Sequence, residues 1–436
     1  MYKNLINKHT IINSVGEFIV FQLGNSGKIN CSFYDSENTF LKDYNLYKEN
    51  ILIYSVIIDE KDIIHLVALS KSGELDYFKY EDEKWSNAII AKFDTQSNTY
   101  NNLSIYVLNK SINIIYCYAN LINSSIWTIQ HITNEKQIWN KYNVISFISD
   151  KKSIPFCLDK DSFGTTHILY RSINNKNSQV FHIFNNPFIN KWNKDPEKTS
   201  PLSYNKTSPY LFIDTCDNLH GIWLENINKN YILKYYKANY QSHEKYIWNE
   251  IKIPLVSNCI DTPIIFEENG MLKILYLTKN HIGYLYSVDY GNTWDNGESL
   301  SIDTSKVCFS RLNDNFFKYN KVKINNLYYS FENKLKFYFV DSLDYINKKT
   351  DNNIETNLEE YNLQIKIVDN IEKVNMQIQK LLIDNEKKLI NQEEIKSIII
   401  EVLENQKNIE EKIAHVLELL YTQKDSFIAK LFNHPK

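Results

Sequence analysis

Short apolar runs separated by polar turns fill residues 1–345, and their length is typical of β-strands. Four turns share a pattern in which an acidic residue is followed six positions later by His or Lys; they are DEKDIIH (59–65), DSFGTTH (161–167), DTCDNLH (214–220) and EENGMLK (267–273). Each leads into an apolar run, which we interpret as the inner strand of a repeated unit. Similar runs without the His begin at 17, 112 and 323, so seven inner strands follow one another at intervals of about 50 residues.

A column of tryptophans repeats with the same period. It consists of Trp85, Trp139, Trp192, Trp248 and Trp294, and Phe40 occupies the equivalent position at its start. A further strand precedes the tryptophan in most units, at 75–80, 125–132, 179–184, 232–238 and 282–288. Short strands repeated with one period predict a mainly β fold, a seven-bladed β-propeller, with six blades as the alternative. The last unit (308–345) lacks a tryptophan, and we expect residues 1–15 to share an outer strand with it.

The segment SVDYGNTW contains the pattern Ser287-x-Asp289-x-Gly291-x-Thr293-Trp294. This pattern resembles the Asp-box of the sialidase-type (BNR-repeat) β-propellers, and FYDSENTF (33–40) is similar to a decayed copy. The resemblance implies a hairpin between the two outer strands of a blade, remote from an active site. The residue types agree with that role, because Asp caps a turn, Gly accepts a positive φ and Trp fills the space between layers.

The arginine content argues against the chemistry of that family. Sialidases of this fold hold the substrate carboxylate with three arginines, whose planar guanidinium groups match it. This chain contains only Arg171 and Arg311, so we predict a protein that is not an enzyme and assign no catalytic residue. An atypical glycoside hydrolase with paired carboxylates stays open as an alternative. Motifs for nucleophilic, metal or phosphate chemistry are missing, and we predict no metal and no cofactor.

Two further groups of side chains raise the question of a binding site. His65, His167 and His220 recur at one position of the repeat, and we interpret them as packing residues rather than as a metal-binding ring. Trp127 and Trp223 lie outside the tryptophan column. They are our candidates for stacking on a sugar or another flat ligand, and packing between blades is the alternative reading.

The pattern changes after residue 345. Residues 346–360 are polar and are predicted to be a linker, whereas 361–430 carry an apolar 4-3 repeat that contains no glycine. The repeat predicts a helical coiled-coil stalk, and β-branched residues at both core positions favour a homotrimer. A helical hairpin is the alternative, because the repeat is polar at 385, 388 and 392. The apolar positions assigned to oligomerisation are Ile371, Val374, Ile378, Leu381, Ile395, Ile399, Val402, Ile409, Ile413, Val416 and Leu420.

The net charge and the N-terminal segment limit the kinds of partner and the compartment that we expect. The net charge is −3, which gives no overall attraction to nucleic acid. The N-terminus has no secretory signal and no apolar run has the length of a membrane span, so we expect a cytoplasmic protein or release by lysis or a non-classical route. We predict a recognition or assembly protein whose head (1–345) binds a glycan or a protein and whose stalk adds avidity. Display on a bacterial, spore or phage-type surface structure is the specific hypothesis, and a scaffold that binds only proteins is the alternative.

Overall fold

The computed structural model describes residues 8–346 apart from short gaps, together with residue 407; the gaps are 25, 37–38, 47–49, 109–110, 136–137, 151–155, 175–176, 187–190, 205, 208, 228–229, 242–244, 318–321 and 332–334. The chain divides into two compact units, residues 1–350 and 351–436. The predicted coiled coil or hairpin, with its oligomerisation positions from Ile371 to Leu420, lies outside the described residues. Within the described part of the chain, no helix has the length and apolarity needed to cross a membrane.

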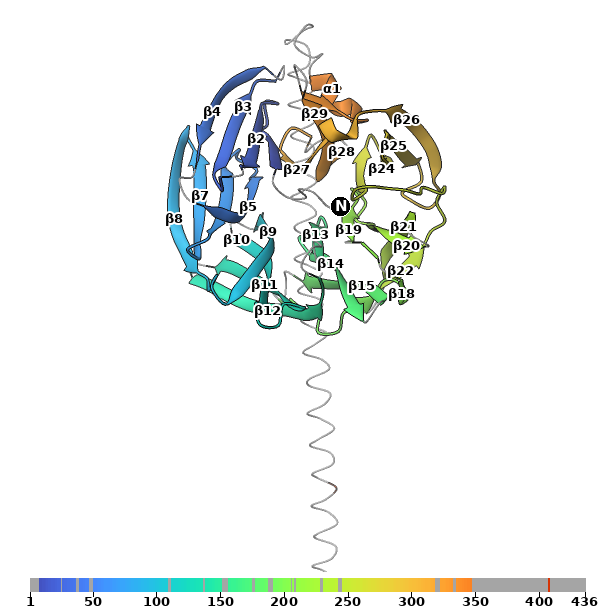
Figure 1. The fold of residues 1–436 in the computed structure, drawn as a ribbon, viewed down its shortest axis with the longest axis horizontal. Coiled ribbons are helices and arrows are strands. Elements are labelled where there is room, and N and C mark those ends of the chain that lie inside the picture. Colours follow the sequence, from blue (N-terminus) through green and yellow to red (C-terminus); the bar gives the residue numbers. More distant parts are fainter. Residues whose placement is uncertain are drawn as a thin grey trace, which may run out of the picture. The chain divides into compact units, whose positions relative to one another are not determined.

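The described strands of the first unit form six sheets, which follow one another in chain order (Figure 1). Three sheets have four strands each: β5 (Ile51–Ile58), β6 (Ile64–Ser70), β7 (Glu74–Glu81) and β8 (Lys84–Lys92); β9 (Asn98–Leu108), β10 (Ser111–Asn120), β11 (Ile126–Glu135) and β12 (Ile138–Ile148); β19 (Tyr210–Ile213), β20 (Leu219–Ile227), β21 (Asn230–Gln241) and β22 (Lys245–Glu250). A six-stranded sheet contains β13 (Phe156–Lys160), β14 (Thr166–Asn174), β15 (Asn177–Asn186), β16 (Lys191–Trp192), β17 (Glu197–Lys198) and β18 (Ser203–Tyr204).

The two remaining sheets are larger because strands from the end of the unit join them. The five-stranded sheet contains β23 (Ile264–Glu268), β24 (Met271–Leu277), β25 (His281–Ser287), β26 (Asp295–Ser301) and β28 (Val322–Lys323). The seven-stranded sheet combines β1 (Lys8–Ile12), β2 (Phe18–Leu23), β3 (Ile29–Tyr34) and β4 (Phe40–Asn45) with β27 (Cys308–Asp314), β29 (Asn326–Phe331) and β30 (Leu335–Phe337). Two short helices complete the described elements, the 3-10 helix η1 (Thr304–Lys306) and α1 (Asp341–Ile346).

The first and last strand groups close the sheets into a ring. β1 pairs antiparallel with β2 and parallel with β27, where His9 lies opposite Arg311. Figure 1 shows the first strands (blue) meeting the last ones (orange) after the other sheets have followed around the centre. A closed ring of small antiparallel sheets is a β-propeller. The expectation that residues 1–15 supply an outer strand is wrong, because β1 and β27 both line the centre.

The strands at the centre are not the ones predicted from the apolar runs. Most residues that line the central cavity belong to β1, β5, β9, β13 and β27, and fewer belong to β6, β7, β10 and β29, whereas the predicted inner strands are the second strands of their sheets, such as β6. Every residue of β6 is buried, and alternate side chains join two different core clusters. A second strand packs on both faces, which explains its unbroken apolar run. An innermost strand borders the cavity and therefore carries polar residues, as at Asn102 and Ser104.

The recurring histidines each bond the aspartate that opens their own turn. The distances from Nε2 to the carboxylate Oδ2 are 3.2 Å for His65–Asp59, 3.4 Å for His167–Asp161 and 3.0 Å for His220–Asp214. The Nδ1 atoms contact a neighbouring strand, at 2.7 Å from the Tyr77 hydroxyl, 3.0 Å from His182 Nε2 and 2.8 Å from the Tyr235 hydroxyl. Both ring nitrogens are therefore engaged inside the repeat. Among the described residues, no cluster of His, Cys, Asp or Glu fits a metal ion.

The same turns tie each unit to the next. In three pairs, the backbone N–H and the hydroxyl of a Ser or Thr both donate to a carboxylate: Ser14 to Asp62 (3.1 and 2.5 Å), Ser162 to Asp217 (2.8 and 2.5 Å) and Thr215 to Glu267 (2.7 and 2.8 Å). The partners are 48, 55 and 52 residues apart, which is one period of the repeat. Hydrogen bonds to a charged acceptor are stronger than neutral ones, so these pairs help to hold the ring together.

The tryptophan column lies at the contacts between successive sheets. Four of its rings contact an aromatic ring of the preceding sheet, with centroid separations of 6.3 Å (Trp85–Phe21), 5.8 Å (Trp192–His131), 5.4 Å (Trp248–His182) and 5.0 Å (Trp294–Tyr235). Trp139 is half-buried and packs against the core cluster that β6 and β10 share. Phe40 does not fit the column, because its side chain is 54% exposed. It lies on β4, an edge strand with every residue exposed.

The segment resembling an Asp-box forms the turn between β25 and β26. Asp289 accepts hydrogen bonds from the backbone N–H groups of Asn292 (3.1 Å) and Thr293 (2.9 Å) and from the Thr293 hydroxyl (2.7 Å). Desolvation raises the pKa of Asp289, but these hydrogen bonds and one from Ser287 together outweigh it and lower that pKa to about 2. Gly291 has a φ of +82°, which suits glycine. The turn is thus a structural cap on the outer edge of its sheet.

Candidate functional site

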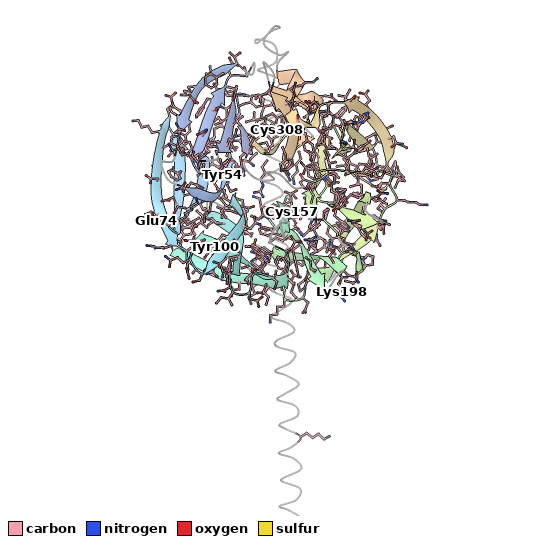
Figure 2. All side chains as sticks on the ribbon, viewed as in Figure 1. Tyr54, Glu74, Tyr100, Cys157, Lys198 and Cys308 are labelled. Carbon is pink, nitrogen blue, oxygen red and sulfur yellow. The ribbon has the colours of Figure 1, made fainter. Side chains whose placement is uncertain are left out.

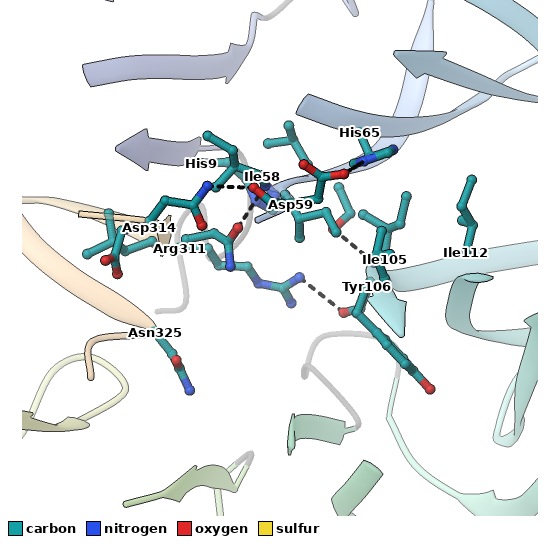
Figure 3. A pocket seen from close by; sticks show the side chains of 18 of the residues that line it. His9, Ile58, Asp59, His65, Ile105, Tyr106, Ile112, Arg311, Asp314 and Asn325 are labelled. Atoms are coloured by element: carbon teal, nitrogen blue, oxygen red, sulfur yellow. Dashed lines mark hydrogen bonds and ion pairs between the residues drawn. The ribbon is translucent and has the colours of Figure 1, made fainter. Parts of the chain in front are cut away.

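A cavity of about 1050 Å³ lies where the innermost strands converge (Figure 3). Figure 2 shows Tyr54, Cys157 and Cys308 toward the middle of the ring and Glu74 and Lys198 toward its rim. Hydroxyl, amide and aromatic side chains line the cavity together, among them Ser55, Tyr77, Asn102, Ser104, Tyr106 and Asn326. Its size is that of sites that hold small molecules.

Arg311 is the arginine that enters this cavity. Its Nη1 donates to the Leu103 carbonyl and to the Ser104 hydroxyl, both at 3.2 Å, and its Nη2 donates to Asn102 Oδ1 at 2.7 Å. All three acceptors are neutral and belong to β9, toward which the side chain extends from β27 in Figure 3. Burial lowers the pKa of Arg311, but a guanidinium group keeps its charge in proteins. Within the described residues, no carboxylate forms an ion pair with it.

His9 lies beside Arg311 on the parallel ladder of β1 and β27. The imidazole is 2% exposed, and its Nε2 has no hydrogen-bond partner among the described residues. Burial, followed by the charge of Arg311, lowers the pKa of His9 well below its usual range, against a hydrogen bond to the Tyr54 backbone. The ring is therefore neutral. Because the other nitrogen donates to Tyr54, Nε2 carries a lone pair without a partner in the described part of the chain, on a residue that lines the cavity.

A second group of charges lies on β13. The Asp159 carboxylate accepts from the backbone N–H of Ile213 (2.7 Å) and from the Lys323 ammonium (3.1 Å). Burial lowers the pKa of Lys160 to about 8, although Asp159 opposes this effect. The Lys160 ammonium lies 4.8 Å from the centroid of the Tyr106 ring, which is close enough for a cation–π interaction. With one carboxylate and two ammonium groups, this wall of the cavity carries a net positive charge at pH 7.

Among the carboxyl groups that line the cavity, Asp314 has the largest shift in pKa. Burial raises its pKa to about 6, even though the Phe317 backbone N–H donates to it at 2.9 Å. At neutral pH it is mostly ionised, and in mildly acidic solution it becomes a neutral hydrogen-bond donor. Like Arg311, it belongs to β27.

The two tryptophans predicted to stack on a ligand do not reach a surface. Trp127 is 2% exposed and belongs to the core cluster between the third and fourth sheets. Trp223 is 0% exposed and stacks on Tyr236 at a centroid distance of 4.5 Å. A ring without an exposed face cannot stack on a ligand, so we correct this assignment. Both side chains pack between blades, which was the alternative reading.

Among the residues that line the cavity, only His65 received a role from the sequence, and Arg311 was named only for the scarcity of arginine. His9, Asp314 and Arg311 lie on innermost strands, whose mixture of polar and apolar positions resembles that of loops. The scarcity of arginine was a usable signal, because it drew attention to Arg171 and Arg311. The structure places the two arginines differently. Arg171 bonds Asp150 at 2.5 Å and the Lys206 carbonyl and is not among the residues that line the cavity. Arg311 does line it.

No protein-family model and no curated protein matches the chain. Among solved structures, the chain is similar to the BP39L lectin from Burkholderia pseudomallei, with 13% identity, a TM-score of 0.44, and coverage of 66% of this chain and 81% of that one. It is also similar to AofleA from Arthrobotrys oligospora (12% identity, TM-score 0.39, 69% and 88% covered) and to the polysaccharide lyase Uly1 (10% identity, TM-score 0.46, 76% and 88% covered). These likenesses are weak, so the propeller assignment rests on sheet order and ring closure.

Proposed function

We propose that the first unit is a non-catalytic recognition module that binds a glycan in its central cavity. The supporting observation is the composition of the cavity wall, where hydroxyl and amide groups line the cavity together with the half-buried ring of Tyr77. Sugars present many hydroxyl groups together with apolar ring faces, and a wall of this kind complements both. A pocket that combines a few convergent polar groups with aromatic surface is the usual form of a ligand site.

The finer features of the proposal concern architecture. We count β27, β29 and β30 as a seventh blade, which shares one sheet with β1–β4. We also propose that the heptad region assembles the chain into a homotrimer, so that three weak sites act together on a repetitive surface. A bacterial, spore or phage-type surface structure is a setting in which such avidity is useful. A scaffold that binds only protein partners is the competing proposal.

Blocking the cavity tests where the ligand binds. We expect the full-length chain to bind members of a glycan array, and we expect Asn325→Trp to abolish that binding. Asn325 lines the cavity, and a tryptophan there fills space without removing a side-chain hydrogen bond described for the wild type. The matched control is Val288→Trp, because Val288 is 67% exposed on the outer turn after β25. Equal binding by both variants, or binding of no glycan at all, would contradict the proposal.

Light scattering tests the assembly. We expect the full-length chain to have three times the mass of the monomer, and we expect Ile399→Asp combined with Val402→Asp to give a monomer. Both residues occupy apolar positions of the heptad repeat, and a buried unpaired charge strongly destabilises such a core. A wild-type monomer would instead support the helical hairpin.

A hydrolase is the second candidate function, and Asp314 is the observation that favours it. A carboxyl group with a pKa of about 6 is suited to act as a general acid. Asp159 lines the same cavity and is held by Lys323 as a hydrogen-bond acceptor. Incubation with fluorogenic glycosides at pH 5 separates the candidates, since turnover that Asp314→Asn abolishes would favour the hydrolase over the binding module.

A further inference from the structure

Arg311 has unused hydrogen-bonding capacity. A guanidinium group has five N–H donors, and the three bonds to β9 engage both donors of Nη1 and one of Nη2. Within the described residues, the Nε–H and the second Nη2–H have no partner. These donors belong to adjacent nitrogens, so they can engage two oxygens of one carboxylate or sulfate group.

The acidic groups of the cavity form no ion pair with Arg311 within the described residues. Asp59 bonds His65 at 3.2 Å, Glu81 bonds Lys79 at 2.5 Å and Asp159 bonds Lys323 at 3.1 Å. Asp314 accepts from the Phe317 backbone. Cys157, Tyr210 and Tyr54 also lie close enough to influence the pKa of Arg311, but burial raises the pKa of each of them, so they are neutral at pH 7, and none is a carboxylate. A buried cation without a counter-ion is costly unless a ligand supplies one.

The neighbouring Nε2 of His9 offers the complementary group. It is a buried hydrogen-bond acceptor without a partner in the described part of the chain, and it lies on the strand that pairs with β27 at Arg311. An unsatisfied buried polar atom carries a desolvation cost that a ligand hydroxyl can relieve. Arg311 and His9 together therefore present two donors and one acceptor side by side.

We propose that the cavity selects acidic sugars, with the carboxylate or sulfate group on the free donors of Arg311 and a sugar hydroxyl donating to His9 Nε2. This inference rests on the proposed glycan-binding function and adds the chemical class of the ligand. The site is formed where β1 and β27 close the ring, so only the closed propeller contains it.

Titration calorimetry on the full-length chain tests this selectivity. The probes are methyl glucuronide, methyl glucoside 6-sulfate and neutral methyl glucoside at low ionic strength. We expect at least one acidic probe to bind roughly 10- to 100-fold more tightly than the neutral one, the range for a charge-assisted bidentate contact. Binding of one acidic probe or of both supports the proposal and identifies the anion.

Two variants and a control locate the contact. Arg311→Lys keeps a positive charge but loses the planar pair of donors, so we expect it to remove most of the preference for the acidic probe. His9→Phe keeps an aromatic ring and loses the acceptor, and we expect a roughly 3- to 10-fold loss of affinity, the value of one hydrogen bond. Arg171→Lys, outside the cavity, is the matched control and leaves the preference intact.

The outcomes are distinguishable even if Arg311→Lys does not fold, because the comparison of probes uses the wild-type chain. Equal affinity for acidic and neutral probes would overturn the selectivity and leave glycan binding in place. No binding of any probe, together with a blank glycan array, would overturn both. An acidic preference that survives in a folded Arg311→Lys and in His9→Phe would also overturn the proposed contact.

Discussion

Acidification from pH 7 to pH 5 is expected to lower the free energy of unfolding of the first unit by about 3 kcal/mol. Burial lowers the pKa of His131 to about 4, and burial also lowers that of His182 to about 4 against its bond to Glu197. In the unfolded chain both titrate near 6.5. Between these values the unfolded state binds protons that the folded state does not, so stability falls as the pH falls. At pH 5 each histidine contributes a loss of about 2 kcal/mol.

Asp314 acts in the opposite direction. Its pKa of about 6 in the folded state lies above the value near 3.9 of an unfolded aspartate, so the folded state binds the extra proton and gains about 1.4 kcal/mol at pH 5. The two histidines therefore outweigh it. The lowered pKa values of His9, His65 and His220, all caused chiefly by burial, act in the same direction as His131 and His182.

Urea unfolding at pH 7 and pH 5 measures this difference. Replacement His182→Gln removes one titrating ring, and we expect it to reduce the pH dependence by about 2 kcal/mol. The control is His281→Gln, because His281 is exposed at the start of β25. Wild-type stability that is the same at both pH values, or a pH dependence equally reduced in the control, would show that these histidines are accessible to protons in the folded state.

Truncation of Trp223 is expected to destabilise the first unit by about 3–5 kcal/mol, the usual cost of emptying a large buried site. The ring is 0% exposed and stacks on Tyr236. We therefore expect Trp223→Ala to lower the midpoint of urea unfolding sharply, and to leave the affinity of the remaining folded protein for a glycan unchanged.

The matched control for this variant is Phe40→Ala. Phe40 is 54% exposed on the edge strand β4, so its loss is expected to change the free energy of unfolding by less than about 1 kcal/mol. If Trp223→Ala remained as stable as the wild type and lost glycan affinity, the ring would be a ligand contact after all and the described packing would be wrong.

The repeat and the identity of most strands were predictable because they depend on local chemistry. The segments 75–80, 125–132, 179–184, 232–238 and 282–288 fall within β7, β11, β15, β21 and β25, apart from residues 125 and 288 at two of the ends. In these segments apolar residues alternate with polar ones or form short runs. This pattern arises because their side chains are buried between neighbouring sheets. The innermost strands were missed because one of their faces borders the cavity and carries polar residues such as His9 and Asn102, so their sequences lack an unbroken apolar run.

The candidate site was hardly predictable, since its members come from distant parts of the chain. Arg311 contacts Ser104 across 207 residues and pairs with His9 through a parallel ladder between the two ends of the first unit. Nothing in the spacing of these residues indicates that they meet. Trp127 and Trp223 stand out in the sequence because they lie off the repeat column, but both rings are buried and cannot contact a ligand.

What the sequence alone determined is the repeated unit: the period, the Asp–His turns and the capped turn at Asp289. Each of these depends on side chains a few residues apart, whose hydrogen bonds form within one turn or hairpin. The tertiary structure alone decided which strand lines the cavity, which arginine enters it and where the ring closes. These features depend on contacts between strands hundreds of residues apart, and such contacts are set by the closure of the whole ring rather than by any local pattern.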